Sequence, residues 1–260
     1  MTDPLIPSNR LRERLAAGER GIGTMVAEFR QPAVMQLLAN AGFDFVIVDG
    51  EHGPFGPESV AELVRAAVAA GVTPIVRVPG CEYTPIAQAL DAGAQGVMVP
   101  RIGGVEDAAE AVAIASYPPE GRRGSAMGRG HTQWRGAEVS AAMAAMNASR
   151  LVMIQIETLG ALEACEQIAA LPGADVLFIG PNDLSIALGV PGQLGHPLVV
   201  EAIERVAAAC RAAGAWSALQ MNTVESAVRW APHVDLLSHA AETGLLQAAG
   251  TAAVGAIRAA

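Results

Sequence analysis

Lysine is missing from this chain of 260 residues, because all 17 of its basic residues are arginine. An enzyme that forms a Schiff base needs an amine nucleophile, which is usually lysine. A phosphate-binding P-loop and the covalent attachment of pyridoxal phosphate require lysine as well. The sequence therefore argues against all three kinds of site.

Charge and aromatic side chains are also scarce, at 17% and 4% of residues, and the net charge is -9. Nucleic acid is not an expected partner, since phosphate binding needs clustered cations. No apolar run is long enough to span a bilayer, and the polar start of the chain lacks a signal-peptide pattern. The three cysteines, Cys81, Cys165 and Cys210, form no CxxC or disulfide framework, so we expect a reducing cytoplasm.

Apolar residues are abundant, at 52% of the chain, and many lie in short runs typical of β-strands. Eight such runs alternate with alanine-rich amphipathic stretches: Gly21–Phe29, Asp44–Gly50, Thr73–Pro79, Gly96–Ile102, Leu151–Glu157, Ala174–Gly180, Ala215–Met221 and Val234–Ala240. This alternation predicts a parallel sheet covered by helices. Eight units over this length favour a single α/β domain, a (β/α)8 TIM barrel over residues 1–260. A doubly wound open sheet is the alternative, although no GxGxxG follows the first strand.

Two segments interrupt the alternation. Residues 117–136 are rich in glycine and arginine and have no periodicity, and residues 185–197 follow the sixth strand. Long loops inside a compact domain are usually functional or disordered. Neither has the composition of a domain linker.

Ionisable and polar residues gather where the predicted strands end, which is where barrel enzymes place their active sites. Such a rim also attracts ordinary solvated charges. In chain order, the residues at these ends are Asp49, Glu51, His52, Arg77, Arg101, Gln155, Glu157 and Asp183.

Glu157 and Asp183 end neighbouring strands, which lie roughly 4.8 Å apart in a parallel sheet. Their oxygens could share one divalent cation and leave positions for water and a substrate, as Mg²⁺ or Mn²⁺ prefers. The equally weighted alternative is that both residues cap helices.

His52 could act as a general base if Asp49 or Glu51 orients its ring. Taken alone, it fits a structural capping residue better. Arg77 lies in an apolar strand, where an unpaired guanidinium would be costly, so it must meet an anion. That anion is either a substrate, which we favour slightly, or Asp49 in a structural ion pair.

The combination of motifs resembles the HpcH/HpaI aldolase family of class II pyruvate aldolases, typified by 4-hydroxy-2-oxoheptanedioate aldolase and 2-dehydro-3-deoxyglucarate aldolase. The resemblance covers nearly the whole chain. It rests on motifs that occur in order at strand ends: FVIVDGEHGP, VRVP, VMVPRI, IQIET and FIGPNDLSIALG.

The resemblance implies reversible cleavage of a 4-hydroxy-2-oxo acid to pyruvate, or a related 2-keto acid, and an aldehyde. Glu157 and Asp183 would bind Mg²⁺ or Mn²⁺, with Co²⁺ or Zn²⁺ as alternatives. His52, partnered with Asp49, would move the proton at the pyruvate methyl carbon, usually through a metal-bound water, and Arg77 would stabilise the enolate.

The substrate would lie between two parts of this site. Backbone amides around Gly180, Pro181, Asn182 and Asp183 would receive the pyruvate carboxylate, because they stand at a helix N-terminus. Gln155 would lie beside the keto acid. Without lysine, a metal and Arg77 replace an iminium as the electron sink.

Two segments depart from the family's pattern. The Arg122–Trp134 loop is shorter and has glycines around Arg129 where alanines are common, which bears on the choice of aldehyde. The eighth strand ends SHAAETGLL, where the family often has a glycine and an aspartate.

The last helix, from Ala241 to Ala260, is apolar nearly all round and carries only Glu242 and Arg258 as charges. Such a helix should be buried on more than one face. We therefore expect it to pack on another subunit, as the family's hexamers, built as trimers of dimers, also imply. The alternative is that its small residues leave little apolar area to bury.

Two other functions compete with this one. A citrate lyase or malyl-CoA lyase would also be a metal-using barrel that cleaves C–C bonds, but such chains are usually longer. A barrel without catalytic activity, serving only to bind, is the other alternative.

Overall fold

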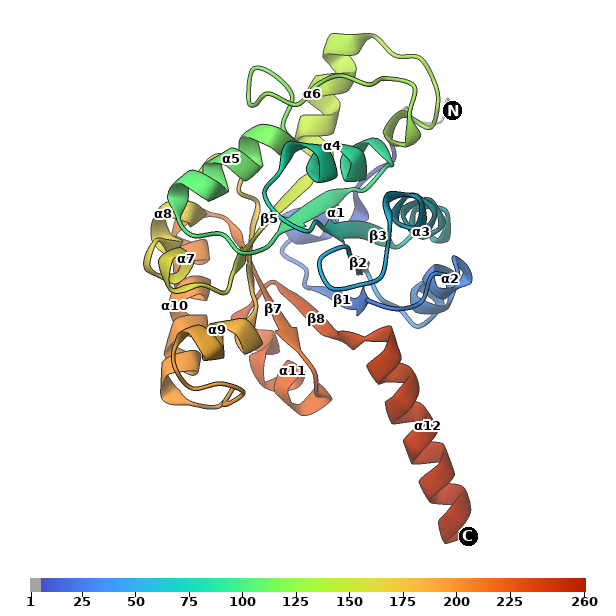
Figure 1. Cartoon of the computed structure of the whole chain (residues 1–260), viewed down its shortest axis with the longest axis vertical. Helices are drawn as coiled ribbons and strands as arrows, with labels where there is room; N and C mark the ends of the chain where they lie inside the picture. Colours follow the sequence, from blue (N-terminus) through green and yellow to red (C-terminus); the bar gives the residue numbers. More distant parts are fainter. Residues whose placement is uncertain (1–5) are drawn as a thin grey trace.

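The computed structural model describes residues 6–260. Its centre is a closed barrel of parallel strands in which each strand pairs with the next and β8 pairs with β1 (Figure 1). The strands are β1 (Gly21–Val26), β2 (Phe45–Asp49), β3 (Thr73–Arg77), β4 (Gly96–Val99), β5 (Leu151–Ile156), β6 (Val176–Ile179), β7 (Trp216–Met221) and β8 (Leu236–Ala241). The predicted (β/α)8 barrel is confirmed, and the β1–β8 pairing rules out the open sheet.

Helices surround this barrel, and the described residues contain twelve α-helices. They are α1 (Arg10–Ala16), α2 (Ala33–Asn40), α3 (Pro57–Ala70), α4 (Tyr83–Asp91), α5 (Val105–Ala115), α6 (Val139–Ser149), α7 (Leu159–Glu163), α8 (Cys165–Ala169), α9 (Pro181–Ala187), α10 (Pro197–Ala213), α11 (Val224–Trp230) and α12 (Glu242–Ala259). Two 3₁₀ turns accompany them, η1 (Gly130–Thr132) and η2 (Ala231–His233). Within this part of the chain, no helix has the length and apolarity that a membrane crossing requires.

The strands are apolar on both faces because one face packs inside the barrel and the other against the helices. In β2, Phe45 and Ile47 belong to the interior cluster, whereas Val46 and Val48 belong to the layer beneath the helices. The interior cluster also includes Leu11 from α1. Helix α1 therefore closes the end of the barrel at which the strands begin.

The 117–136 segment packs on α4, on the outside of the barrel. Arg123 is buried and donates to Asp91 at the end of α4, with Nη2 2.5 Å from Oδ1. His131 is also buried, and its Nδ1 lies 3.2 Å from the Asp91 carbonyl oxygen. These contacts order a segment that has no periodicity in the sequence.

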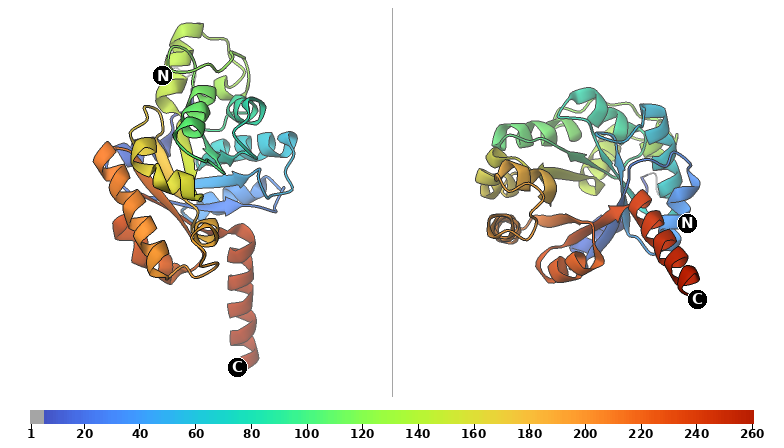
Figure 2. Two further views of the ribbon diagram at one scale, coloured as in Figure 1. Left: turned by 60° about the vertical axis from the view of Figure 1, so that its left-hand side comes forward. Right: turned by 60° about the horizontal axis from the view of Figure 1, so that its bottom comes forward.

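Helix α12 runs away from the barrel in both views of Figure 2. Its first residue, Glu242, is buried, but every residue from Leu246 to Ala260 is exposed. A regular barrel would pack the helix after β8 between α11 and α2. That place in the ring is not taken by α12.

Candidate active site

Strand periodicity determines which side chains reach the mouth of the barrel. Successive residues of a strand point to opposite faces. Phe45 and Ile47 face the interior, so Asp49 at the end of β2 does as well. The same alternation turns Arg77 inward after Ile75, and Gln155 inward after Met153. These three polar residues thus stand on top of the apolar plug that fills the barrel.

Arg77 is held by two carboxylates. Its Nε lies 2.9 Å from Asp49 Oδ1 and its Nη2 lies 2.6 Å from Asp49 Oδ2, a bidentate pair. Its Nη1 is 3.1 Å from Glu51 Oε2. Of the five N–H groups of a guanidinium, two are hydrogen-bonded to Asp49, so others on Nη1 and Nη2 remain for another oxygen. The ion pair between Asp49 and Arg77 that the sequence left as an alternative is therefore present, and it leaves Arg77 able to bind a substrate.

The Asp49 carboxylate also accepts the backbone N–H groups of Glu51 and His52, at 3.1 and 3.2 Å. Burial alone would raise the pKa of Asp49, but the hydrogen bond and charge of Arg77, with these two N–H groups, lower the pKa overall. Asp49 is thus a fixed anion that orients Arg77.

The side chain of His52 lies at the rim and is 68% exposed. Its Nε2 is 3.8 Å from Glu51 Oε1, beyond hydrogen-bond distance. Asp49 contacts the backbone of His52, whereas its carboxylate is directed to Arg77. In this structure, Glu51 is therefore the carboxylate nearest to the His52 ring, and Asp49 is not its partner.

Glu157 follows β5 and is buried. One of its oxygens accepts the backbone N–H of Arg101 at 2.8 Å, and the other accepts the Gln155 amide. Burial raises the pKa of Glu157; the Arg101 N–H acts against this rise, and the negative charges of Asp183 and Glu51 add to it. Arg101 takes a left-handed conformation, with φ of 59°, as it presents this N–H.

Glu157 and Asp183 suit a hard divalent cation. Gly180 and Asp183 line one cavity, and a Cβ atom at Gly180 would lie 3.0 Å from a Glu157 oxygen, so both carboxylates stand at the same end of the barrel. The charge of Asp183 helps to raise the pKa of Glu157. Asp183 Oδ1 lies 3.9 Å from Arg101 Nη1. Glu157 accepts two hydrogen bonds, and a carboxylate retains free lone pairs after two such bonds.

Among residues 6–260, no group of three or more His, Cys, Asp or Glu side chains converges on one point. A cation at Glu157 and Asp183 would therefore take its other ligands from water or substrate, as Mg²⁺ and Mn²⁺ commonly do. The residues present fit such an ion.

A cavity of about 240 Å³ opens beside these residues. His52, Arg77, Gln155 and Asp183 line it, as do Gly180, Pro181 and Asn182 at the start of α9. A Cβ atom at Gly180 would lie 3.0 Å from both the Gln155 amide nitrogen and a Glu157 oxygen. The absence of a side chain there allows β5 and β6 to bring these groups together.

The cavity also contains residues that the sequence analysis did not select. Gln220 and Asn222 stand at the end of β7, Ala240 and Ala241 end β8, and Met25, Met98 and Phe178 form an apolar wall. Alternation in β7 signals Gln220, because Ala218 is interior and Gln220 is two residues further on. The sequence carries this signal near the end of the strand predicted over Ala215–Met221.

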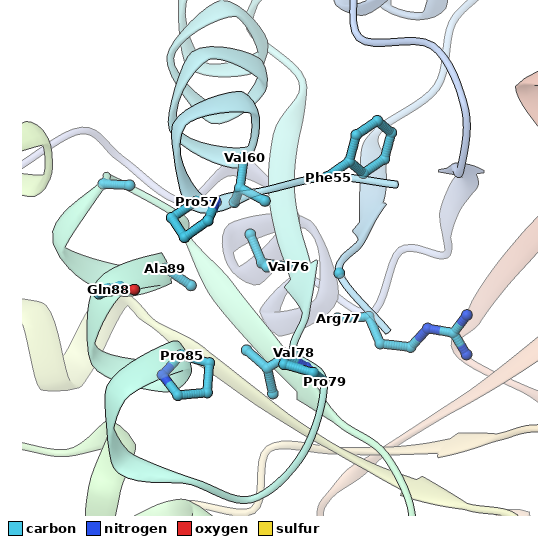
Figure 3. Close-up of a pocket in the computed structure, with 12 residues that line it drawn as sticks. Phe55, Pro57, Val60, Val76, Arg77, Val78, Pro79, Pro85, Gln88 and Ala89 are labelled. Carbon is cyan, nitrogen blue, oxygen red and sulfur yellow. The ribbon is translucent and has the colours of Figure 1, made fainter. Parts of the chain in front are cut away.

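A smaller cavity of about 130 Å³ lies on the outside of the barrel, between α3 and α4. Phe55, Val60 and Pro85 line it, and Figure 3 shows the Arg77 side chain pointing away from them. Apart from Arg77, its polar side chain is Gln88, whereas the larger cavity is lined by a histidine, a carboxylate and several amides. The guanidinium and the chemistry it supports thus belong to the mouth of the barrel.

This (β/α)8 barrel carries carboxylates, an arginine and a histidine at its strand ends. Barrel enzymes place their active sites there, so the fold and the site together are those of a barrel enzyme. A family model described as HpcH/HpaI aldolase/citrate lyase matches residues 25–240. The chain belongs to this family.

Similar proteins agree with this assignment. The chain is 39% identical over 198 residues to a hydroxypyruvate/pyruvate aldolase of Sagittula stellata, covering 76% of this chain and 77% of the relative. It is 32% identical to a 2-keto-3-deoxy-L-rhamnonate aldolase of Escherichia coli, covering 86% and 84%. The crystal structure of an HpcH/HpaI aldolase from Desulfitobacterium hafniense matches with a TM-score of 0.90 and 32% identity, covering 95% and 96%.

Proposed function

We propose that this protein is a divalent-metal-dependent class II aldolase. It would cleave a 4-hydroxy-2-oxo acid reversibly to pyruvate, or a related 2-keto acid, and an aldehyde. The observation that carries the proposal is the pair Glu157 and Asp183 beside a cavity that His52 and Arg77 also line. The relatives named as aldolases support the same reaction class.

The reaction needs a sink for an electron pair. When the C3–C4 bond breaks, the C4 hydroxyl loses its proton and becomes the aldehyde. The electrons of the broken bond form an enolate with its charge on the C2 oxygen. A proton then adds to C3, so that no proton is consumed overall. The proposed Mg²⁺ or Mn²⁺, or alternatively Co²⁺ or Zn²⁺, supplies positive charge beside this oxygen.

Arg77 would offer N–H groups that Asp49 does not occupy to the enolate oxygen. Asp49 and Glu51 are positioning residues, because they fix the direction in which the guanidinium points. His52 would exchange the proton at C3, and its exposed position at the rim allows that proton to pass to solvent. Asn182 and Asp183 lie in the first turn of α9, where backbone N–H groups lack intrahelical partners and suit a carboxylate.

The first experiment measures pyruvate released by retro-aldol cleavage, before and after exhaustive treatment with EDTA. We expect activity to disappear on chelation and to return with Mg²⁺ or Mn²⁺. Borohydride added with substrate should trap no adduct, because the chain has no lysine. Full activity after chelation, or a covalent adduct found by mass spectrometry, would refute the metal mechanism.

We further propose that the protein is a homo-oligomer, such as a trimer of dimers, in which α12 packs on a second copy. The exposed apolar side chains Leu246, Val254 and Ile257 lie on α12. Leu37 on α2 and Val228 on α11 are 67% and 66% exposed, on the two helices that flank the open place after β8. A helix from another subunit would cover both sets of side chains.

We also propose that the enzyme works in the cytoplasm, in the breakdown of aromatic or sugar acids. Its three cysteines are unpaired, and Cys165 and Cys210 are buried. This pattern suits a reducing compartment.

A further inference from the structure

The part of the cavity formed by β7 and β8 is polar but carries no charge. Its polar side chains are Gln220 and Asn222, and the strand ends beside them contribute Ala240 and Ala241. The basic side chains that line the cavity are His52 and Arg77, which come from the β2 and β3 side. This asymmetry bears on which aldehyde the site accepts.

Arg77 is directed to the β2 side, because its Nε and Nη2 donate to Asp49 and its Nη1 lies 3.1 Å from Glu51 Oε2 in an ion pair. Arg101 does not line the cavity, and its guanidinium lies toward Asp183. A carboxylate at the far end of an aldehyde would therefore meet two amides and no cation within this chain. Transferring a charged group to such a place is costly.

Gln220 is set up to interact with a hydroxyl. Its Nε2 donates to the Ala240 carbonyl oxygen at 3.1 Å. This bond fixes the orientation of the amide, because the opposite orientation would place two oxygens together. Its Oε1 is buried and has no donor among the described residues. A buried acceptor without a partner costs free energy, which a donor from the substrate would recover.

Gln220 lies at the same height along the barrel axis as Glu157, one of the two proposed metal ligands. In the strand registers, Ile156 is opposite Ile179, and Ile179 is opposite Leu219. The next residues along β5, β6 and β7 are Glu157, Gly180 and Gln220. Neighbouring strands are about 4.8 Å apart, so Gln220 stands roughly 10 Å from Glu157 across the mouth. Gln220 is therefore within reach of an aldehyde that adds to a keto acid held at Glu157.

We propose that Gln220 determines specificity by accepting a hydrogen bond from a hydroxyl group of the aldehyde. The acceptor substrate is then an uncharged hydroxyaldehyde, rather than a semialdehyde that carries a carboxylate. This inference rests on the aldolase function proposed above. It assigns the β7 side of the cavity to the aldehyde.

The test uses three two-carbon aldehydes, each with pyruvate as the donor and Mg²⁺ present: acetaldehyde, glycolaldehyde and glyoxylate. They differ in bearing a methyl, a hydroxymethyl or a carboxylate group. We expect Gln220→Leu to lower the kcat/KM ratio of glycolaldehyde to acetaldehyde by roughly 3- to 10-fold, the value of one hydrogen bond. Gln220→Met, which keeps the length of the side chain, should lower it similarly.

Gln220→Arg should raise the ratio of glyoxylate to glycolaldehyde by about tenfold or more, because it adds the missing cation. The matched control is Gln88→Leu, which removes an exposed glutamine at the outer cavity and should leave both ratios unchanged. Because each ratio compares two aldehydes in one protein, partial loss of folded enzyme does not alter it.

Exchange of the pyruvate methyl protons with deuterated water separates the two hypotheses, since it needs no aldehyde. Wild-type protein that exchanges these protons, with aldehyde ratios that the Gln220 variants leave unchanged, would overturn the role of Gln220. Wild-type protein that fails to exchange them would overturn the aldolase function itself.

Discussion

At the scale of single residues, His52 and Arg77 differ in how they are held. His52 is mostly exposed, and the contact of its ring with Glu51 is long. Arg77 is buried and joined to two carboxylates. Replacing each with alanine should therefore separate a loss of chemistry from a loss of structure.

We expect His52→Ala to lower kcat by about 10²–10⁴-fold, the usual contribution of a general acid or base. The free energy of unfolding should change by less than about 0.5 kcal/mol, as is usual for an exposed position. Steady-state kinetics and urea unfolding measure the two quantities. Kinetics like those of the wild type would show that His52 has no part in catalysis.

Arg77→Ala should also lower kcat, but here the free energy of unfolding should fall by about 3–5 kcal/mol, because Asp49 remains buried without its partner. The double variant Asp49→Asn/Arg77→Ala is the control and should recover part of that loss. A single variant as stable as wild-type protein would contradict the structural role of the pair.

The polar contacts show the limit of prediction from the sequence at this scale. Spacing along the chain left Asp49 and Glu51 both open as partners of His52, and the family resemblance favoured Asp49. The strand instead turns Asp49 into the barrel toward Arg77, and His52 lies beyond the strand end. Side-chain direction at such a turn depends on tertiary geometry, which spacing does not describe.

At the scale of elements, all eight strands were predictable, because burial on both faces leaves near-continuous apolar runs. The first strand was predicted to reach Phe29 but ends at Val26. The reason is Glu242, whose carboxylate accepts the backbone N–H groups of Ala27, Glu28 and Phe29 at 2.7–3.1 Å. A contact between residues so far apart has no signal in local sequence.

The start of α12 therefore depends on Glu242. We expect Glu242→Ala to lower the free energy of unfolding by about 2–3 kcal/mol, because three N–H groups lose a charged acceptor. Urea unfolding at one fixed protein concentration measures this. Glu201→Ala, on the exposed face of α10, is the matched control and should change stability by less than about 0.5 kcal/mol. Equal effects of the two substitutions would show that the Glu242 contacts contribute little.

The eighth strand ends SHAAETGLL, which departs from the family's pattern, and the backbone conformation is unusual at this point. Ala240 adopts a left-handed conformation, with φ of 54°. Glycine adopts that conformation at no steric cost, whereas other residues do so uncommonly. Its carbonyl oxygen is the acceptor that orients Gln220.

At the scale of the whole molecule, α12 is the part that a single copy leaves uncovered. Sedimentation at micromolar concentration should report a mass several times the 26.6 kDa of one chain. The double variant Leu246→Asp/Ile257→Asp should lower that mass, because it places charges on the apolar surface. Gln247→Asp, on the same exposed helix, is the control and should leave it unchanged. A wild-type monomer would rule out assembly through this helix.

Helix α1, which closes one end of the barrel, has a consequence for how the protein can evolve. Leu11 and Leu15 pack into the same interior cluster as Phe45 and Phe178, so mutations in the plug affect whether the chain folds. The mouth of the barrel is free of that constraint at Asn182, Asn222 and neighbouring loop positions. Selection can therefore explore new substrates at one end while the other end preserves the scaffold, and a mutant library aimed at new acceptors belongs at the mouth.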